Sequence, residues 1–383
     1  MKKILIAGGG VGGVVAAKRL SEKLKDKAEI TMVSDNEKYE FPPFFANVAL
    51  GDMTPEEVGL PLSRLQSRGI KFVRAKINKV DPENRKVLTD SGELPYDYLL
   101  ASLGIEYDFD TYNLGSGYHN FTLDGAIKMR DGLSSFGSGR LVVFTPHPMY
   151  RCGIYPFEIV NQLDSAFRKR GIRDKVSITL VHPFKVPIEP LGSEAAKITE
   201  ELFKQKGIEY FGGLKPVKVD SQRKTVQMEG QEIPYDFLIT VPPIKVPSPF
   251  VGTSLTKATP MGEWTDIDPL TGRSKKYDDV FLPGEHSMPT LGLPTAGVPV
   301  HFTSLASSSV ISGEILGEPV DPGQINAMVC AMDYGDLGLV INCDISQENG
   351  ALKWIGNCYS VLTSPLGKYV KDMFYRSFLL TSM

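Results

Sequence analysis

The sequence predicts an α/β protein with two Rossmann-like dinucleotide-binding domains and a C-terminal membrane-associating region. Three observations predict this fold class: a glycine loop between a strand and a helix, two similar hexapeptides far apart in the chain, and a basic, aromatic C-terminal segment. The 383 residues amount to two or three typical domains, so more than one packed unit is expected.

The first unit begins with a strand, a glycine loop and a helix. An apolar run at 4–7 predicts a buried strand, glycines follow at positions 8, 10 and 13, and a helix is expected over 14–20. Such a turn lets backbone N–H groups and a helix N-terminus meet a pyrophosphate. The next strand, 29–33, ends at Ser34 and Asp35, where a ribose-binding acid is expected. A dinucleotide site is therefore predicted; the alternative is a glycine-rich turn without a ligand.

The chain then repeats this pattern. The hexapeptides PYDYLL and PYDFLI each follow an apolar strand at nearly equal spacing, 92 residues from Ile4 to Tyr96 and 93 from Val142 to Tyr235. This repetition predicts a duplicated nucleotide-binding fold, and strands that alternate with helices predict parallel sheets. In the second unit, helices are expected at 157–170 and 193–206, with a strand at 176–181.

The glycine loop is missing from the second unit. After its first strand the sequence is TPHPMYRCG at 145–153, with prolines at 146 and 148. Proline has no N–H group to offer a phosphate, so this unit is expected to have lost NAD(P)H binding. The loop instead places Cys152 near the interface between the two units.

A third segment is predicted to return to the first unit. An apolar strand at 279–283 ends at Gly284 and Glu285, and the sequence LPTAG at 293–297 leads into a helix of small residues at 303–316. The N-terminus of that helix is suited to negative charge on a bound flavin ring.

Composition and charge exclude several classes of function. With 42 Lys and Arg against 45 Asp and Glu the net charge is -3, so no global positive field is available to hold nucleic acid. No apolar run reaches the ~18 residues of a membrane span. Five scattered histidines lack metal-ligand spacing, so no metal site is predicted. Four cysteines are too few for a disulfide framework, and local chemistry is expected of them.

These segments together resemble the two-dinucleotide-domain flavoproteins and, within them, the sulfide:quinone oxidoreductases. The flavoprotein subunit of flavocytochrome c sulfide dehydrogenase and type 2 NADH dehydrogenases are relatives of that family. The resemblance covers essentially the whole chain. Its most specific parts are GGGVGG at 8–13, the stretch 30–52, YDYLLASLG at 96–104, CGIYPFE at 152–158 and MVCAMDYGDLGLVI at 328–341.

The resemblance implies non-covalent FAD, a redox pair of Cys152 and Cys330, and a catalytic Glu158. It divides the chain into a first part of the FAD-binding domain at 1–110, a second Rossmann-like domain at 111–264, a second part of the FAD-binding domain at 265–320, and a C-terminal quinone and membrane region at 321–383. The residues expected to bind FAD are Gly8, Gly10, Val11, Gly12, Gly13, Ser34, Asp35, Pro42, Ile77, Ser102, Gly104, Gly284, Glu285, Thr295 and Gly297.

The sequence departs from the family pattern at three places. Many members have a cysteine and, four residues later, a histidine in a Cys-Thr-Ile-Asp-His context, where this chain has Phe121 to Gly125. The absence of that cysteine argues against a covalent flavin link there. A common Lys in the Pro-Lys-Thr-Gly loop is replaced, because this chain has PTAG at 294–297. The usual Gly-Asp is Gly284 and Glu285, and the longer carboxylate is expected to accept the same hydrogen bonds.

The candidate catalytic residues have two interpretations each. A helix N-terminus near Pro156 and the neighbouring Arg151 are expected to lower the pKa of Cys152. The alternative is a buried, inert thiol, and this alternative applies to Cys330 as well. Glu158 is either a general base or an acid favoured by the dipole in the first turn of a helix.

The C-terminal segment predicts an amphipathic helix. Its apolar residues stand at 366, 369, 370, 373, 374 and 378, interrupted by Lys368, Lys371 and Arg376. A basic, aromatic helix of this kind suits insertion into one membrane leaflet, where a quinone is found. The alternatives are packing on the protein's own core or an oligomer interface, so a homo-oligomer stays open. Because no export signal is visible, a peripheral (monotopic) membrane protein on the cytoplasmic side is predicted.

The predicted function is FAD-dependent oxidation of sulfide to polysulfide or sulfur through Cys152 and Cys330, with electrons passed to a membrane quinone. Three alternatives stay open: a sulfide dehydrogenase flavoprotein that donates to a cytochrome, an NADH:quinone oxidoreductase, and a non-catalytic flavin-binding redox sensor. Cys343 and Cys358 have no family counterpart and are expected to be structural.

Overall fold

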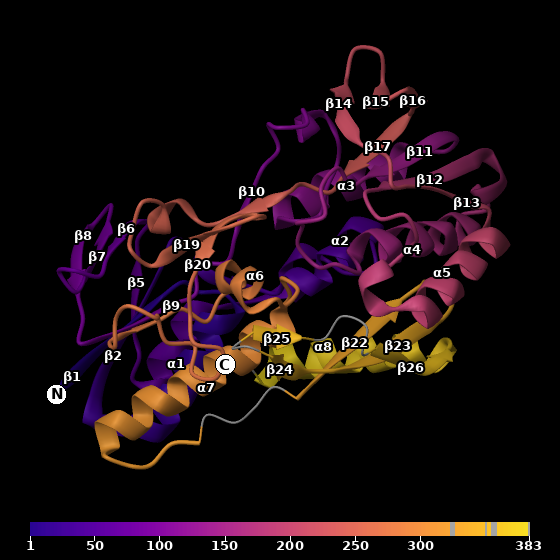
Figure 1. Cartoon of the computed structure of the whole chain (residues 1–383). Coiled ribbons are helices and arrows are strands. Elements are labelled where there is room, and N and C mark those ends of the chain that lie inside the picture. The colour runs from indigo at the N-terminus through magenta and orange to yellow at the C-terminus, as the bar shows by residue number, and fades with distance from the viewer. Residues whose placement is uncertain (322–325, 349–350, 354–357, 382–383) are drawn as a thin grey trace.

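The computed structural model describes residues 1–321, 326–348, 351–353 and 358–381. It has two α/β units side by side, with a C-terminal layer packed against them (Figure 1). The mixed α/β fold class predicted from the sequence is confirmed.

The first unit is built around a parallel sheet in the order β21-β9-β1-β2-β5. The run from Ile4 to Ala7 in β1 is buried on both faces, as expected of a parallel strand covered by helices. Helices α1 and α7 pack against each other on this sheet. The elements are β1 (Lys2–Ala7), α1 (Val11–Leu24), β2 (Ala28–Ser34), β5 (Lys71–Arg74), β9 (Tyr98–Ala101), β21 (Val280–Phe281) and α7 (Gly297–Leu316).

The second unit repeats the first. Its parallel sheet has the order β13-β12-β11-β17, so the first strand of each unit lies between the second strand and the strand of its hexapeptide. Ile4 pairs with Tyr98 in one unit and Leu141 pairs with Phe237 in the other. The elements are α3 (Leu123–Ser135), β11 (Gly139–Phe144), α4 (Tyr155–Lys169), β12 (Val176–His182), α5 (Ser193–Lys206), β13 (Ile208–Gly212) and β17 (Phe237–Thr240).

Small antiparallel sheets complete the two units. Each unit has a three-stranded sheet before its hexapeptide, and each of these sheets has one irregularity in register. Strands β10 and β18 pair where the chain crosses between the units. The elements are β3 (Lys38–Glu40), α2 (Phe45–Leu50), β4 (Gly59–Pro61), β6 (Ile77–Asp81), β7 (Lys86–Thr89), β8 (Gly92–Pro95), β10 (Glu106–Tyr107), β14 (Pro216–Asp220), β15 (Thr225–Met228), β16 (Gln231–Pro234), β18 (Ile244–Lys245), β19 (Thr256–Thr259), β20 (Gly262–Thr265) and α6 (Met288–Leu291).

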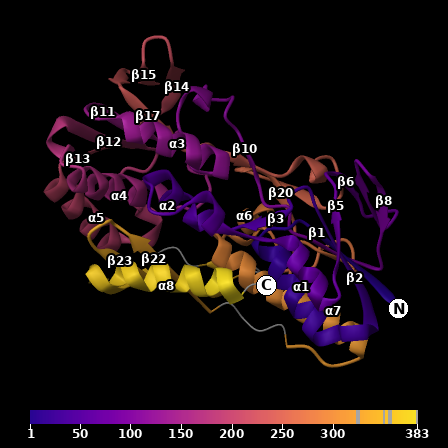
Figure 2. The ribbon, with the colours of Figure 1, turned by 180° about the vertical axis from the view of Figure 1, so that it is seen from behind.

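The C-terminal layer is an antiparallel sheet, β22-β23-β26, with α8 lying against it (Figure 2). A disulfide joins Cys343 to Cys358, which face each other across β23 and β26, so the structural role expected of these two residues is confirmed. In the described residues no helix is long and apolar enough to cross a membrane. The elements are β22 (Ala327–Asp333), β23 (Gly338–Asp344), β24 (Ser346–Glu348), β25 (Ala351–Lys353), β26 (Cys358–Ser364) and α8 (Pro365–Thr381).

Candidate active site

A cavity of about 840 Å³ lies where the two units meet the C-terminal layer. Its lining is mostly apolar and includes residues of α1, α4, β22 and α8, which are far apart in the chain. Of the residues predicted from the sequence, the cavity is lined by Val11, Pro42, Cys152, Glu158, Thr295, Gly297 and Cys330.

The glycine loop beside this cavity has the geometry of a phosphate site. Gly10 is the N-cap of α1, no side chain of the described residues caps the helix there, and a Cβ added to Gly10 would meet nothing within 4 Å. A Cβ on Gly8, whose φ is +107°, would stand 2.3 Å from the Ser102 carbonyl oxygen. One on Gly13 would stand 1.9 Å from the Gly8 oxygen. The close backbone approach and the open helix N-terminus fit a dinucleotide pyrophosphate.

Ser34 and Ser102, two of the other residues predicted to bind the cofactor, lie against this loop. Ser34 is buried at the end of β2, and Asp35 beyond it is exposed. A Cβ on Gly12 would stand 2.2 Å from Ser102 Oγ and 2.8 Å from the Pro283 carbonyl oxygen, so the segment after β21 packs directly on the glycine loop. Of the remaining ones, Ile77 lies on β6, Gly104 follows β9 with φ +72°, and Gly284 follows β21.

Cys152 lies in the loop between β11 and α4 with a left-handed backbone, φ 62°. This conformation is uncommon outside glycine and occurs at functional sites. The Cys152 N–H donates to the Thr295 carbonyl at 2.9 Å, and the Thr295 hydroxyl donates to the Tyr150 carbonyl at 3.0 Å. The cysteine loop is therefore held by the segment that leads into α7.

Two free thiols, Cys152 and Cys330, line the same cavity. Burial raises the pKa of Cys152 to about 11; Glu158 adds to this rise, while Lys371 and Arg151 oppose it. Burial also raises the pKa of Cys330 to about 12. The prediction of a lowered pKa at Cys152 is therefore wrong for the dithiol form, because the loss of hydration outweighs the nearby cations and the helix N-terminus.

Arg151, beside the cysteine, forms a bidentate ion pair with Glu285. Its Nε donates to Oε1 at 2.8 Å, and its Nη2 lies 2.8 Å from Oε2. A further bond runs from Nη1 to the Tyr107 hydroxyl at 3.0 Å. The carboxylate expected to contact the cofactor is thus already bound to a cation from the cysteine loop.

Glu158 lies in the first turn of α4 but is buried and paired. Its Oε1 accepts the Asp333 N–H at 2.7 Å and forms an ion pair with Lys371 of α8. Burial raises the pKa of the Glu158 carboxyl, while Lys371 opposes that rise. This carboxylate, in the first turn of α4, joins α4, β22 and α8.

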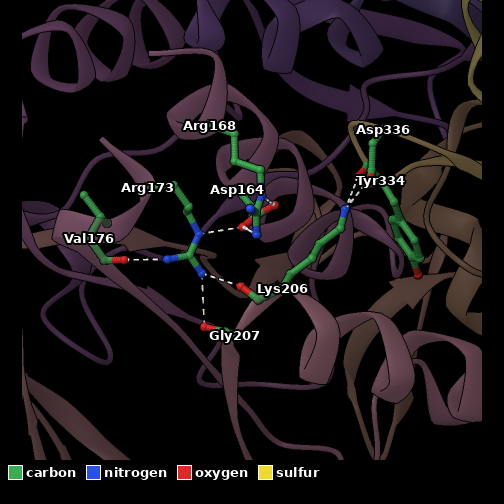
Figure 3. A network of polar contacts seen from close by, with 8 residues as sticks. All are labelled: Asp164, Arg168, Arg173, Val176, Lys206, Gly207, Tyr334 and Asp336. Carbon is green, nitrogen blue, oxygen red and sulfur yellow. Dashed lines mark hydrogen bonds and ion pairs between the residues drawn. The ribbon is translucent and has the colours of Figure 1, made fainter. Parts of the chain in front are cut away.

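The turn that follows Cys330 is anchored to the second unit by the network in Figure 3. Lys206 at the end of α5 is buried, donates to the Tyr334 carbonyl at 2.7 Å and pairs with Asp336. Arg173 donates to the Lys206 carbonyl at 2.6 Å. These bonds fix the end of β22 and with it the position of Cys330.

Phe121 stands where many family members have a third cysteine, and it lines the cavity. Its ring lies 4.9 Å from that of Tyr155 and 5.4 Å from that of Tyr107. The described residues contain no cluster of His, Cys, Asp and Glu that could hold a metal ion.

Most of the apolar residues of α8 are exposed, and Tyr369, Val370 and Phe374 among them also line the cavity. The alternative of a helix packed on the protein's own core is supported in part, because α8 packs against β22, β23 and β26. The ring of Phe378 stacks on Phe41 with centroids 5.5 Å apart. The exposed members are Leu366, Tyr369, Val370, Met373 and Phe374, and each of these residues is 39% to 66% accessible to solvent.

Sequence reasoning missed the role of Lys371. It was placed among the basic residues of an amphipathic helix, but its side chain is only 12% exposed and is paired with Glu158. The sequence did offer one signal: Lys371 stands next to apolar positions of the predicted helix. A charge that is buried with such positions needs a partner of opposite charge.

Comparisons with known proteins agree with the predicted resemblance. The chain is 29% identical over 317 residues to the mitochondrial sulfide:quinone oxidoreductase of Dictyostelium discoideum, which covers 79% of this chain and 68% of that protein. It is 24% identical over 354 residues to the sulfide-quinone reductase of Aquifex aeolicus, covering 88% and 82%. The type II NADH:quinone oxidoreductase of Staphylococcus saprophyticus is 22% identical over 375 residues, covering 91% and 92%.

Among solved structures, the sulfide:quinone oxidoreductase of Aquifex aeolicus superposes with a TM-score of 0.89 at 22% identity, covering all of this chain and 91% of the other. This likeness supports the fold. No family model matches the chain. The resemblance to sulfide:quinone oxidoreductases predicted from the sequence is confirmed, and the NADH:quinone oxidoreductases are more distant relatives.

Proposed function

We propose that this protein is an FAD-dependent sulfide:quinone oxidoreductase in which Cys152 and Cys330 form the redox pair. The observation that carries the proposal is the shared cavity. Two thiols from different parts of the chain line it, and the glycine loop at positions 8–13, here called the glycine cradle because its geometry suits a dinucleotide, lies beside it. The relatives named above are enzymes of this type, and they support the same assignment.

The proposed reaction at the two cysteines has two steps. Hydrosulfide attacks one sulfur of a Cys152–Cys330 disulfide, forming a persulfide on that cysteine and releasing the other as a thiolate. The thiolate and the persulfide then join as a trisulfide, which releases one proton and two electrons. When bound, the flavin supplies the acceptor for those two electrons, and a membrane quinone takes them onward. Further hydrosulfide lengthens the chain toward polysulfide or sulfur.

The FAD site is proposed from the fit of the residues around the glycine loop. The open N-terminus of α1 would hold the pyrophosphate, and Ser34 and Asp35 lie where the adenosine ribose is expected. Phe121 offers no thiol to the flavin, so the cofactor is proposed to be non-covalent. A denatured and precipitated sample should release all of its yellow colour into the supernatant.

Glu158 is proposed to accept the proton of hydrosulfide, with Lys371 as its charged partner. Both side chains are nearly inaccessible to solvent, and Glu158 lies within electrostatic reach of both thiols. Burial raises the pKa of the Glu158 carboxyl, which favours its acceptance of a proton, and Lys371 balances the charge of the carboxylate while it is deprotonated. In the proposal, Glu158 takes the proton released when the trisulfide forms.

The exposed face of α8 is proposed to bind one membrane leaflet, close to the quinone. Its exposed apolar residues form a stripe, whereas Lys368 and Lys371 turn toward the protein. Replacing Leu366, Met373 and Phe374 by Ser should abolish sedimentation with phosphatidylcholine vesicles. Sedimentation equal to that of the unmodified protein would count against this part of the proposal, and a size increase reversed by the same substitutions would indicate the oligomer alternative.

The NADH:quinone alternative is opposed by the second unit itself. His182, at the end of β12, is 1% exposed, and its Nε2 lies 2.9 Å from the Tyr150 hydroxyl. Rings of Phe157 and Phe184 lie within 4.8 Å of His182, so side chains crowd the end of this strand. A nucleotide ribose would need that space.

The chain is proposed to be divided into domains and to bind the membrane peripherally. We keep the divisions at 110, 264 and 320 and a peripheral membrane association. The Cys343–Cys358 disulfide favours an oxidising compartment over the cytoplasmic side predicted from the N-terminus, because disulfides are rare in reducing compartments.

A steady-state assay with a soluble quinone analogue tests the proposal. Purified, FAD-loaded protein should reduce the quinone with sulfide as the donor and not with NADH. Reduction by NADH alone would favour the NADH:quinone alternative, reduction of added cytochrome c in place of quinone the cytochrome alternative, and no turnover with either donor the sensor.

A further inference from the structure

Arg151 joins two parts of the molecule that the proposed chemistry needs together. We propose that Arg151 is a positioning residue whose ion pair with Glu285 neutralises the carboxylate beside the flavin and ties the Cys152 loop to the cofactor segment. This inference rests on the proposed FAD site, and it assigns a role to a residue that neither the glycine loop nor the cysteine pair includes.

The position of Glu285 places this pair next to the nucleotide cradle. Glu285 follows β21, which lies at the edge of the first sheet beside β9. The preceding Pro283 oxygen would stand 2.8 Å from a Cβ on Gly12, so this segment touches the glycine loop. The Glu285 side chain is 7% exposed. A buried carboxylate without a partner is costly, and Arg151 supplies the partner.

The other end of the link is the cysteine loop. Arg151 precedes Cys152, whose N–H bonds to Thr295, while the Arg151 side chain reaches Glu285 and Tyr107. The loop is therefore fixed to three separate segments of the chain outside the second sheet. Because the planar guanidinium binds Glu285 through two nitrogens and Tyr107 through the third, it fixes the orientation of the loop as well as its distance from these residues.

The ion pair with Arg151 accounts for a glutamate, in place of the shorter aspartate, at position 285. An aspartate at 285 would withdraw the carboxylate by one C–C bond, about 1.5 Å, and the two 2.8 Å contacts could not both persist without movement of the loop. We therefore treat Glu285 and Arg151 as a matched pair. The usual Gly-Asp of the family is expected to work less well in this chain as long as Arg151 is present.

The test is a double-mutant cycle read out by the flavin reduction equilibrium, measured anaerobically against a reference dye. The reduced flavin carries more negative charge, so Arg151→Met should disfavour it about tenfold and Glu285→Gln should favour it about tenfold, or ~30 mV each for a two-electron couple. The double variant should return to within about threefold of the unmodified protein. A purely structural role would not give opposite signs that cancel.

Conservative variants guard against loss of folding or of FAD. Arg151→Lys and Glu285→Asp keep both charges, so the equilibrium should stay within about threefold. Sulfide-driven flavin reduction at saturating sulfide should nevertheless slow about tenfold in each, because the two-pronged contact is lost. Arg140→Met removes a matched but exposed pair with Asp236 in the second unit and should change neither quantity.

Shifts of the same sign in the two single variants, or no shift in either, would overturn the inference. Where sulfide does reduce the unmodified protein, an unchanged reduction rate in Glu285→Asp would also overturn it. The dye equilibrium needs no sulfide. If the cancelling pattern appears in a protein that sulfide does not reduce, the proposed function fails and this inference stands.

Discussion

The two α/β units share a scaffold and differ in the loop that follows the first strand. In both, the residue after that strand donates its N–H to the second strand, Gly8 to Val33 and Thr145 to Val181. Three residues then separate β1 from α1, whereas ten separate β11 from α4. The short loop is glycine and leaves a helix N-terminus open; the long loop contains prolines, Arg151 and Cys152. One scaffold thus carries either an open glycine loop or a loop with a free cysteine after its first strand.

The largest effect is expected at the thiols. Cys152→Ser and Cys330→Ser should each keep FAD and lose sulfide-dependent flavin reduction by about 10³-fold or more, because the sulfur acceptor is removed. The matched control replaces the disulfide pair: Cys343→Ser with Cys358→Ser should lower the melting temperature and leave the rate within about twofold. Stopped-flow absorbance measures the rate, and full activity in either single variant would remove the cysteine pair from the mechanism.

The glycine cradle should fail when it receives a side chain. A Cβ on Gly13 would overlap the Gly8 oxygen, so Gly13→Ala should weaken FAD binding about 10- to 100-fold, the equivalent of 1–3 kcal/mol of overpacking. In the second unit, a Cβ on Gly137 would meet nothing within 4 Å, so Gly137→Ala should retain FAD fully. Fluorescence titration of the apoprotein with FAD measures both, and equal affinities would contradict the cradle.

The buried ion pair should matter more than an exposed one. Lys371→Met leaves Glu158 buried without its cation and should destabilise the protein by about 3–5 kcal/mol, as found when one partner of a buried pair is removed. Lys371→Met with Glu158→Gln should recover much of that loss. The exposed Arg140–Asp236 pair is the control, and Arg140→Met should leave the urea midpoint nearly unchanged. A single variant as stable as the unmodified protein would show that α8 is not anchored here.

The pH dependence of thiol reactivity separates burial from cation effects. In Cys330→Ser, Cys152 is the one thiol that is neither replaced nor bonded, because Cys343 and Cys358 form a disulfide. With its pKa raised to about 11, the thiolate fraction should grow about tenfold per pH unit from pH 7 to 10. Iodoacetamide labelling followed by mass spectrometry measures this slope. A plateau near pH 8 would restore the lowered pKa expected from the sequence.

The sequence predicted the parts of the fold that depend on local pattern. The strands beside the glycines, the helix at Ser193–Lys206 and the repeated hexapeptides are found as expected, because periodicity and glycine spacing are properties of short segments. The strands of the C-terminal sheet were not predicted, since their register comes from the pairing of β22 with β23 and of β23 with β26, the two strands that the disulfide joins.

Charge and burial were harder to predict than the fold. The sign of the pKa shift at Cys152 was wrong because it depends on how much water α8 and β22 exclude, and both come from nearly 180 residues or more away in the chain. The pairing of Arg151 with Glu285 was likewise hidden, although each residue had been noticed separately. Long-range contacts of single side chains leave no periodic signal in one sequence.

The central claim is that sulfide electrons reach FAD through the second unit's cysteine while its nucleotide site is lost. Anaerobic mixing of FAD-loaded protein with sulfide, and separately with NADH, tests it most directly by flavin absorbance. We predict that sulfide bleaches the flavin absorbance and that NADH does not. Adding a quinone analogue should then restore the oxidised spectrum. Bleaching by NADH but not by sulfide would contradict the account.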